Sequence, residues 1–272
     1  MNPPALHGRM AKPPVPAIRG PLQGQAALIT GAAQRIGAEV ATRLAASGCD
    51  IVIHHRKSGK EATRLAASLQ KAHGIQTATV AGDLGDANDR ARLVPEASKA
   101  LGKRLTLLVN NASSFPEKRL MDLTLDHLHE ALAVNAWAPF ELARDLAKQL
   151  PRGAQGSVVN FLDARIVDDD RRHVGYFLAK RMLADLTRLM ALELAPRINV
   201  NAVAPGPTLP PPGWDPDEGA KLMARLRRRL PLQRTAEPTD LADAVQFLLS
   251  ARVVTGQILF VDGGRHLGRQ PG

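Results

Sequence analysis

The chain has 272 residues, of which 44% are hydrophobic and only 3% aromatic, and this favours one domain of helices packed on a sheet over a β-sandwich. A formal net charge of +10 admits nucleic acid, a membrane surface or an anionic small molecule as partner. The single cysteine, Cys49, excludes an internal disulfide, and no run of about 18 apolar residues is present to span a membrane. We expect a cytoplasmic protein that binds neither a membrane nor a metal.

Arginines spread along the chain supply most of the charge, with one dense run at Arg225, Arg227, Arg228 and Arg229. We interpret this run as the solvated face of a helix, because no aromatic residues alternate with it as they would in a groove for single-stranded nucleic acid. Nucleic-acid binding is kept as an alternative, which a strong salt dependence of DNA retention would support.

Residues 1–21 are rich in proline, alanine and basic residues and lack the apolar centre of a secretion signal, so we predict a disordered tail. The alternative for this segment is a targeting role. A single domain is expected over residues 22–268.

Short apolar runs alternate with segments of helical spacing along this domain. They predict strands at 25–30, 50–54, 76–80, 105–109, 157–162, 198–202 and 257–261, and helices at 36–47, 59–73, 86–101, 125–150, 176–194 and 239–250. Such alternation is typical of an α/β fold with a doubly wound parallel sheet, the Rossmann arrangement. Ligands of this architecture bind outside the carboxyl ends of the strands, so functional residues should follow strands directly.

The first predicted strand runs into the sequence TGAAQRIG, which has the features of a phosphate-binding turn. Gly31 permits the tight turn, small residues let the backbone approach a pyrophosphate, and Gly37 lets the next helix pack closely. The N-terminus of that helix, at Arg35 and Ile36, offers free N–H groups to the phosphates. The alternative is an ordinary connection between a strand and a helix.

The residues after the second predicted strand indicate which dinucleotide is bound. Enzymes that prefer NAD place a carboxylate there, whereas this chain has His55, Arg56, Lys57 and Ser58. Because a basic pocket without a carboxylate suits a 2′-phosphate, the sequence predicts NADPH as cofactor. An exposed basic turn is the alternative.

Tyr176 is the only tyrosine of the chain, and Lys180 follows it at the i, i+4 spacing that puts both on one helix face. A neighbouring ammonium lowers the pKa of a phenol, so the pair could transfer a proton near neutral pH. Asn135 stands inside an apolar helix, where a buried amide needs a hydrogen-bonding reason such as a kink. The alternatives are a surface helical pair and a structural amide.

Taken together, the segments TGAAQRIG, NNAS, the Asn135 helix, YFLAK, NVNAVAPG and VDGG resemble the short-chain dehydrogenase/reductase family over residues 22–268. The resemblance implies that Tyr176 donates the proton, Lys180 also binds the nicotinamide ribose, and Asn135 holds a proton-relay water. Further cofactor contacts are implied for Asp83, Leu84, Asn111, Ala112, Ser113, Pro205 and Gly206. The family is usually tetrameric, so a homotetramer is expected.

The chain departs from the family where a serine usually polarises the substrate carbonyl, because Asp163 stands there. A carboxylate would repel a developing oxyanion, which argues against a plain ketone substrate. Together with Arg35, Ser113 and Phe115, Asp163 makes the chain similar to the pteridine reductases, in which the pterin stacks between the phenylalanine and the nicotinamide. The resemblance implies hydride transfer from NADPH to a C=N bond of a dihydrobiopterin-, dihydromonapterin- or dihydrofolate-like substrate, with the proton from Tyr176 or Asp163.

The proline-rich segment 208–217 follows a strand where the family's substrate lid lies, and its Trp214 is expected to cap the pocket. Two alternatives to a pterin reductase stay open at this point. One is a carbonyl reductase such as a 3-oxoacyl-carrier-protein reductase, which Asp163 disfavours. The other is a non-catalytic NADPH-binding regulator, which the intact pair of Tyr176 and Lys180 disfavours.

Overall fold

A seven-stranded, wholly parallel sheet forms the centre of the protein in the computed structural model, which describes residues 21–211 and 213–268. The strand order is β3-β2-β1-β4-β5-β6-β7. The strands are β1 Ala26–Ile29, β2 Asp50–His55, β3 Thr77–Ala81, β4 Leu107–Asn110, β5 Gly156–Phe161, β6 Ile198–Pro205 and β7 Ile258–Val261. The predicted doubly wound parallel sheet is confirmed, whereas the predicted tail lies outside the described residues up to position 20.

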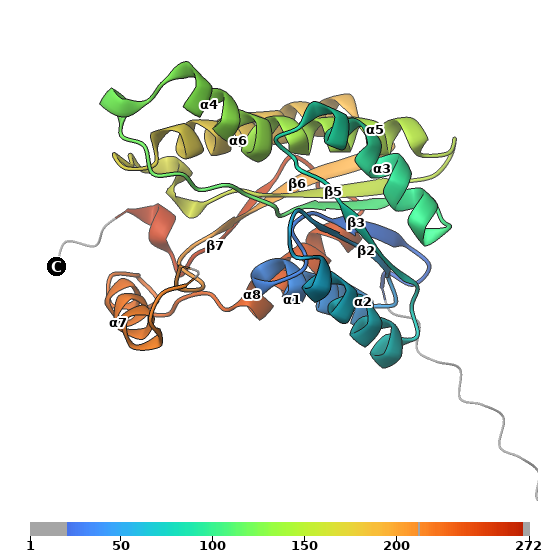
Figure 1. Cartoon of the computed structure of the whole chain (residues 1–272), viewed down its shortest axis with the longest axis horizontal. Coiled ribbons are helices and arrows are strands. Elements are labelled where there is room, and N and C mark those ends of the chain that lie inside the picture. Colours follow the sequence, from blue (N-terminus) through green and yellow to red (C-terminus); the bar gives the residue numbers. More distant parts are fainter. Residues whose placement is uncertain (1–20, 212, 269–272) are drawn as a thin grey trace, which may run out of the picture.

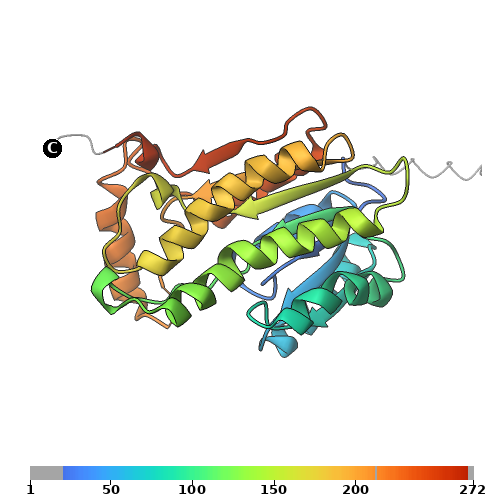
Figure 2. The ribbon, with the colours of Figure 1, turned by 90° about the horizontal axis from the view of Figure 1, so that it is seen from above.

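Helices cover both faces of this sheet (Figure 1). One face carries α1 Arg35–Ala46, α2 Gly59–His73 and α8 Pro238–Ser250. The other carries α3 Ala87–Leu101, α4 Leu125–Leu132, α5 Ala138–Gln149 and α6 Val174–Glu193, and α4 continues into α5 as one long helix that runs beside α6 (Figure 2). No helix in the described part of the chain is both long and apolar enough to cross a membrane.

The helix predicted over 125–150 contains a wider turn at its middle. A π-helical segment, Ala133–Trp137, joins α4 to α5 and has Asn135 at its centre, fully buried. Such π segments are rare and occur mostly at functional sites. The expected irregularity at Asn135 is therefore present, as a π turn that leaves the helix continuous.

Helix α7, Pro216–Arg227, begins after the proline-rich segment and lies beyond one end of the sheet (Figure 1). Asp215 caps it by accepting from the backbone N–H groups of Asp217 and Glu218. Three prolines and a glycine precede this helix, so its start could not be located from periodicity alone. Arg225 and Arg227 lie on the last turn of this helix, and Arg228 and Arg229 directly follow it. All four are exposed, in keeping with the interpretation as a solvated face.

The strand order reverses between β1 and β4, because successive strands β1 to β3 run outward on one side and β4 to β7 on the other. Loops leaving the carboxyl ends of β1 and β4 therefore diverge to opposite faces and open a crevice between them. The glycine turn follows β1 and the asparagine pair follows β4, so both predicted motifs border this crevice.

Candidate active site

A cavity of about 1100 Å³ opens at this crevice. Every residue predicted from the glycine turn, the basic turn and the asparagine loop lines it. The lining includes Gly31, Arg35, Ile36, Gly37, His55, Arg56, Lys57, Ser58, Asp83, Leu84, Asn111, Ala112, Ser113 and Phe115. Residues from the ends of four strands thus converge on one elongated space that is large enough for a dinucleotide.

The glycine turn is held so close to the asparagine loop that side chains would not fit. A Cβ at Gly31 would meet the Cα of Ala112 at 3.0 Å, and one at Gly37 would lie 2.6 Å from the carbonyl oxygen of Gly31. Arg35 adopts φ 56°, in the left-handed region that favours glycine, and its guanidinium donates to the carbonyl of Pro210 at 2.8 Å. Arg35 therefore links the cofactor turn to the segment that precedes α7.

His54, at the end of β2, fixes the conformation of the glycine turn. Its Nδ1 accepts from the backbone N–H of Gly31 at 3.1 Å, and its Nε2 lies 3.1 Å from the carbonyl oxygen of Gly82. Burial lowers the pKa of His54 to about 4, so the ring is neutral and Nε2 carries the proton. Local sequence patterns did not predict this role of His54, and their one signal is a polar residue at the end of an apolar strand.

The basic turn after β2 lies open at the cavity wall. Arg56 pairs with Asp83 at 3.7 Å, with both side chains about half exposed, so the guanidinium can turn toward an anion in the cavity. Nδ1 of His55 is buried without a hydrogen-bond partner in the described structure. A buried ring nitrogen without a partner, beside two exposed cations, suits a phosphate oxygen when that nitrogen carries the ring proton.

Tyr176, Asp163 and Arg165 form the centre of the site. Asp163 follows β5, and Tyr176 lies on the first turn of α6, which begins two residues earlier than predicted. The phenol donates to Oδ2 of Asp163 at 3.2 Å. Arg165 donates to both carboxylate oxygens of Asp163 at 3.3 Å, and also pairs with Asp170 at 3.0 Å. The carboxylate in the place of the family's serine therefore has its own counter-ion.

Arg165 is also enclosed by aromatic rings. Its guanidinium carbon lies 4.7 Å from the ring centre of Phe177 and 5.5 Å from that of Phe115. Burial alone would lower the pKa of Arg165, but the charge of Asp163 and its hydrogen bond more than offset this and raise it. Arg165 is consequently a positive charge held by the carboxylates of Asp163 and Asp170 and by the two phenylalanine rings.

The pKa of Tyr176 is raised well above its ordinary value, chiefly by burial and then by the charge of Asp163, with Arg165 opposing. The expectation that Lys180 lowers the phenol's pKa is therefore wrong for this structure. The ammonium lies 5.8 Å from the ring centre and donates to the carbonyl of Phe161 at 2.6 Å. Being nearly completely buried, Lys180 itself has its pKa lowered to about 8.

Asn135 fixes the loop after β4. Its Oδ1 accepts from the hydroxyl of Ser113 at 2.7 Å and from the N–H of Ser114, and its Nδ2 donates to the carbonyls of Ser114 and Ala131 at 3.0 Å. These bonds occupy the amide that the family resemblance assigns to a proton-relay water. In this structure Asn135 thus positions Ser113 and Ser114 at the cavity wall.

Phe115 stands at the open side of the site. His173 stacks on one face of its ring with centres 3.9 Å apart and planes at 12°, and Tyr176 meets it edge-on at 4.6 Å. The side chain is nonetheless 48% exposed, so part of the ring remains available for a flat ligand.

A second cavity, of about 1350 Å³, begins at Asp163 and Arg165 and passes Pro205 and Gly206 toward α7. It gives room for a small molecule next to Asp163 and Arg165. Trp214, expected to cap this pocket, is half exposed and does not line either cavity. The proline-rich segment turns its leucine and proline side chains to the cavity instead.

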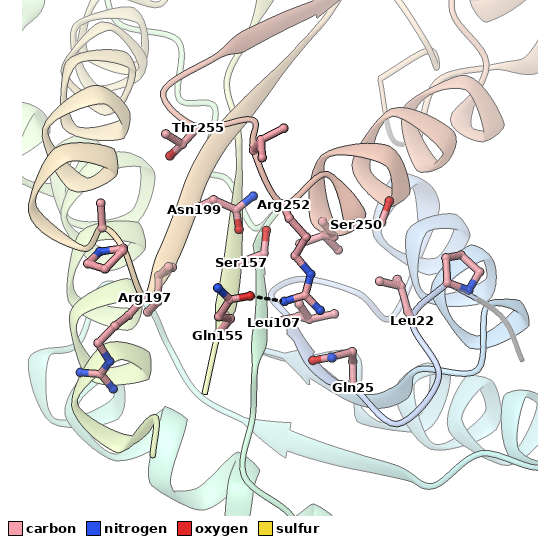
Figure 3. A pocket seen from close by; sticks show the side chains of 17 residues that line it. Leu22, Gln25, Leu107, Gln155, Ser157, Arg197, Asn199, Ser250, Arg252 and Thr255 are labelled. Atoms are coloured by element: carbon pink, nitrogen blue, oxygen red, sulfur yellow. Dashed lines mark hydrogen bonds between the residues drawn. The ribbon is translucent and has the colours of Figure 1, made fainter. Parts of the chain in front are cut away.

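A third cavity, of about 250 Å³, lies at the opposite end of the sheet and is lined by Ser157, Arg197 and Arg252, among others (Figure 3). Arg252 donates to the side chain of Gln155 at 2.7 Å across it. No predicted site residue lines this space. It adjoins the amino ends of the strands, away from the crevice where ligands of this architecture bind. In the described residues no cluster of three or more metal-ligating side chains occurs.

The geometry can be compared with known proteins. The family model described as Enoyl-(Acyl carrier protein) reductase matches residues 31–266. Pteridine reductase 1 of Leishmania tarentolae is 32% identical over 89% of this chain and 96% of its own. The structure of FolM alternative dihydrofolate reductase 1 from Brucella suis in complex with NADP is 36% identical, covering 90% of this chain and 96% of that one, with a TM-score of 0.81. The angucycline C-6 ketoreductase LanV with bound NADP is 30% identical, covering 92% and 98%, with a TM-score of 0.81.

The burial of Lys180 predicts a pH dependence of stability. Between pH 8 and about 10.4 the unfolded chain holds a proton on this lysine that the folded chain has released, so its contribution to the free energy of unfolding rises with pH. Lys180→Met removes this contribution. We expect the stability of the wild type relative to Lys180→Met to increase between pH 7.5 and 9.5, as measured by urea unfolding.

Lys221→Met, at an exposed position of α7, is the matched control and should show no such trend. A difference between wild type and Lys180→Met that is constant over this range would contradict the assignment.

Proposed function

Because the chain belongs to the short-chain dehydrogenase/reductase family, we propose that it reduces a dihydropterin with NADPH. The observation that carries this proposal is Asp163, a carboxylate hydrogen-bonded to the catalytic phenol at the position where the family usually has a serine. A carboxylate accepts hydrogen bonds from the amino group and ring N–H groups of a pterin, whereas a ketone offers none of these donors. The relatives named as a pteridine reductase and an alternative dihydrofolate reductase support the same substrate class.

The cofactor follows from the same family. The prediction of NADPH is confirmed by the similar solved reductases, which contain NADP. The residues of this chain fit it, because the glycine turn leaves no room for side chains against Ala112 and the basic turn presents Arg56 and the unpartnered His55. The chain is an NADP-dependent reductase, and its specific substrate is the part that we propose.

The residues of the site would divide the reaction as follows. Bound NADPH would supply a hydride to the carbon of a C=N bond and would itself become NADP⁺. Tyr176 delivers the proton to the nitrogen, since its raised pKa keeps the phenol protonated at neutral pH. Asp163, kept in an ion pair by Arg165, acts as acceptor for the pterin's N–H groups. Arg165 also stabilises the phenolate until solvent returns a proton.

Phe115 would hold the plane of the pterin. One face of the ring is covered by His173, so the ligand has a defined side on which to stack. Asn135 fixes Ser113 beside it, and the glycine and asparagine loops place the cofactor on the other side of the ligand.

The basic turn predicts the cofactor preference of a variant. Arg56→Ala should raise the KM for NADPH about tenfold, because a charge-assisted hydrogen bond to the 2′-phosphate is lost, and should leave the KM for NADH within about twofold. Arg64→Ala, an exposed arginine on the neighbouring α2, serves as the charge-matched control. Equal effects on the two cofactors would place Arg56 away from the 2′-phosphate.

The decisive experiment is NADPH oxidation by the purified protein with dihydrobiopterin, dihydrofolate and a β-ketoacyl ester in parallel. We expect turnover of the pterins only. Tyr176→Phe should lower kcat at least about 100-fold, because the proton donor is lost. Asp163→Ser should abolish turnover of the pterins, while Asp126→Ser, at an exposed aspartate of α4, should not change it.

The outcomes separate the candidate functions. Turnover of the ketoester alone would overturn the pterin proposal and favour a carbonyl reductase, in keeping with the similarity to LanV. Binding of NADPH without turnover of any of the three substrates would favour a non-catalytic regulator.

We propose further that the protein is a homotetramer. Helix α6 exposes Leu178, Leu189 and Leu192, whose side chains are 42%, 60% and 78% exposed, so one face of a helix on the surface of the subunit presents three leucines together with the exposed Asp185. Native mass spectrometry should find four chains of 29.2 kDa. Leu189→Glu with Leu192→Glu should give smaller species, and an unchanged tetramer would place the interface elsewhere.

A further inference from the structure

The second cavity leads from the catalytic carboxylate to a pair of arginines. Asp163 and Arg165 line one part of it, and Arg228 and Arg229, which directly follow α7, line another. Substrate bound at Asp163 therefore has a continuous path to two guanidinium groups. These arginines belong to the dense basic run, for which the sequence suggested only a solvated face.

The carboxylates in this cavity are already paired with other cations. Asp163 and Asp170 both pair with Arg165. Asp168 pairs with Arg265 at 3.0 Å, and Asp169 with Arg181 at 3.1 Å. Each of these four aspartates is thus paired, with three arginines that come from the loop after β5, from α6 and from the turn after β7.

Arg228 and Arg229, in contrast, form no ion pair with any carboxylate side chain of the described chain. Both are exposed, so their guanidinium groups are free to meet an anion that enters from solvent. Among the arginines that line the cavity, these two at the α7 end are consequently the ones without an ion pair in the described structure. Such an end attracts a ligand that carries carboxylates.

The wall between these two ends is apolar. Leu222, Met223 and Leu226 of α7 line the cavity, and Leu209 and Pro211 line it from the segment before the helix. Leu222, Leu226 and Arg229 are spaced four and three residues apart, so they share one face of the helix and its continuation. An aromatic or aliphatic spacer would be buried here, between a polar head at Asp163 and an anionic tail at the arginines.

We infer that this cavity takes a dihydropterin with a carboxylate-bearing tail, and that Arg228 and Arg229 bind the tail carboxylates. The inference rests on the proposed function and narrows it to a dihydrofolate-like substrate. In dihydrofolate an aminobenzoyl ring links the pterin to a glutamate with two carboxylates, which matches the order of head, apolar wall and cationic end. Dihydrobiopterin has a short hydroxylated side chain and offers the arginines no charge.

The test compares kcat/KM for dihydrofolate with kcat/KM for dihydrobiopterin in the full chain. In Arg228→Gln/Arg229→Gln the ratio should fall roughly fivefold or more, since two partly exposed ion pairs are lost. Dihydropteroate, which lacks the glutamate, should lose less than dihydrofolate. Added salt should lower the wild-type ratio and change that of the variant little.

Arg225→Gln/Arg227→Gln is the matched control, because it removes two exposed arginines from the same run that do not line the cavity. Its ratio should equal that of the wild type. A binding measurement supports the kinetics: with NADP⁺ present, dihydrofolate should raise the melting temperature of the wild type and the control more than that of the Arg228/Arg229 variant.

Two results would overturn the inference, and they are distinguishable. Turnover of both pterins with a ratio that the Arg228/Arg229 variant shares with the wild type would remove the tail site and leave the proposed function intact. No turnover of either pterin by the wild type would remove the proposed function together with the inference.

Discussion

A carboxylate beside a phenol inside a protein requires a compensating cation, and the active site of this chain is arranged around that requirement. Asp163 accepts from Tyr176 and is neutralised by Arg165. Without the guanidinium, burial and the carboxylate would both oppose ionisation of the phenol, and the charge of Asp163 would lack a partner in a poorly solvated site. Asp163 and Arg165 therefore act as a pair in this site.

Arg165 in turn depends on its surroundings. Asp170 holds its other end, and Phe115 and Phe177 present their rings to it. Asp170 also accepts from the backbone N–H groups of Arg172 and His173, which outweigh the effect of burial and lower its pKa. The segment that follows β5 is thus folded around one guanidinium, and the same segment supplies His173, which covers one face of Phe115. The same segment after β5 therefore supplies both the cation that neutralises Asp163 and the ring that limits the space beside Phe115.

The sequence predicted the parts of the site that follow from local rules. Strand ends, the glycine turn and the i, i+4 pair of Tyr176 and Lys180 depend on neighbours along the chain, and the structure brings the turn and loop residues to one cavity as expected. The role of His54 as a tie between Gly31 and Gly82 depends on strand pairing, which local periodicity does not specify. The predicted lowering of the Tyr176 pKa was wrong because burial and the charge of Asp163 raise it, and the Lys180 ammonium is turned toward the carbonyl of Phe161. Trp214 was misplaced for a similar reason, since its direction depends on where the turn before α7 lies.

The parallel sheet separates the two ligands of the proposed reaction. Ends of β1, β2, β3 and β4 form the first cavity, with Phe115 in its wall, while ends of β5 and β6 and the α7 segment form the second. Arg35 joins the two cavities, because it lies in the glycine turn and bonds to Pro210 in the segment before α7. Its left-handed backbone, at a position where the family often has glycine, costs about 1 kcal/mol locally. Arg35 is therefore unfavourable for its own turn, and its bond to Pro210 ties that turn to the segment before α7.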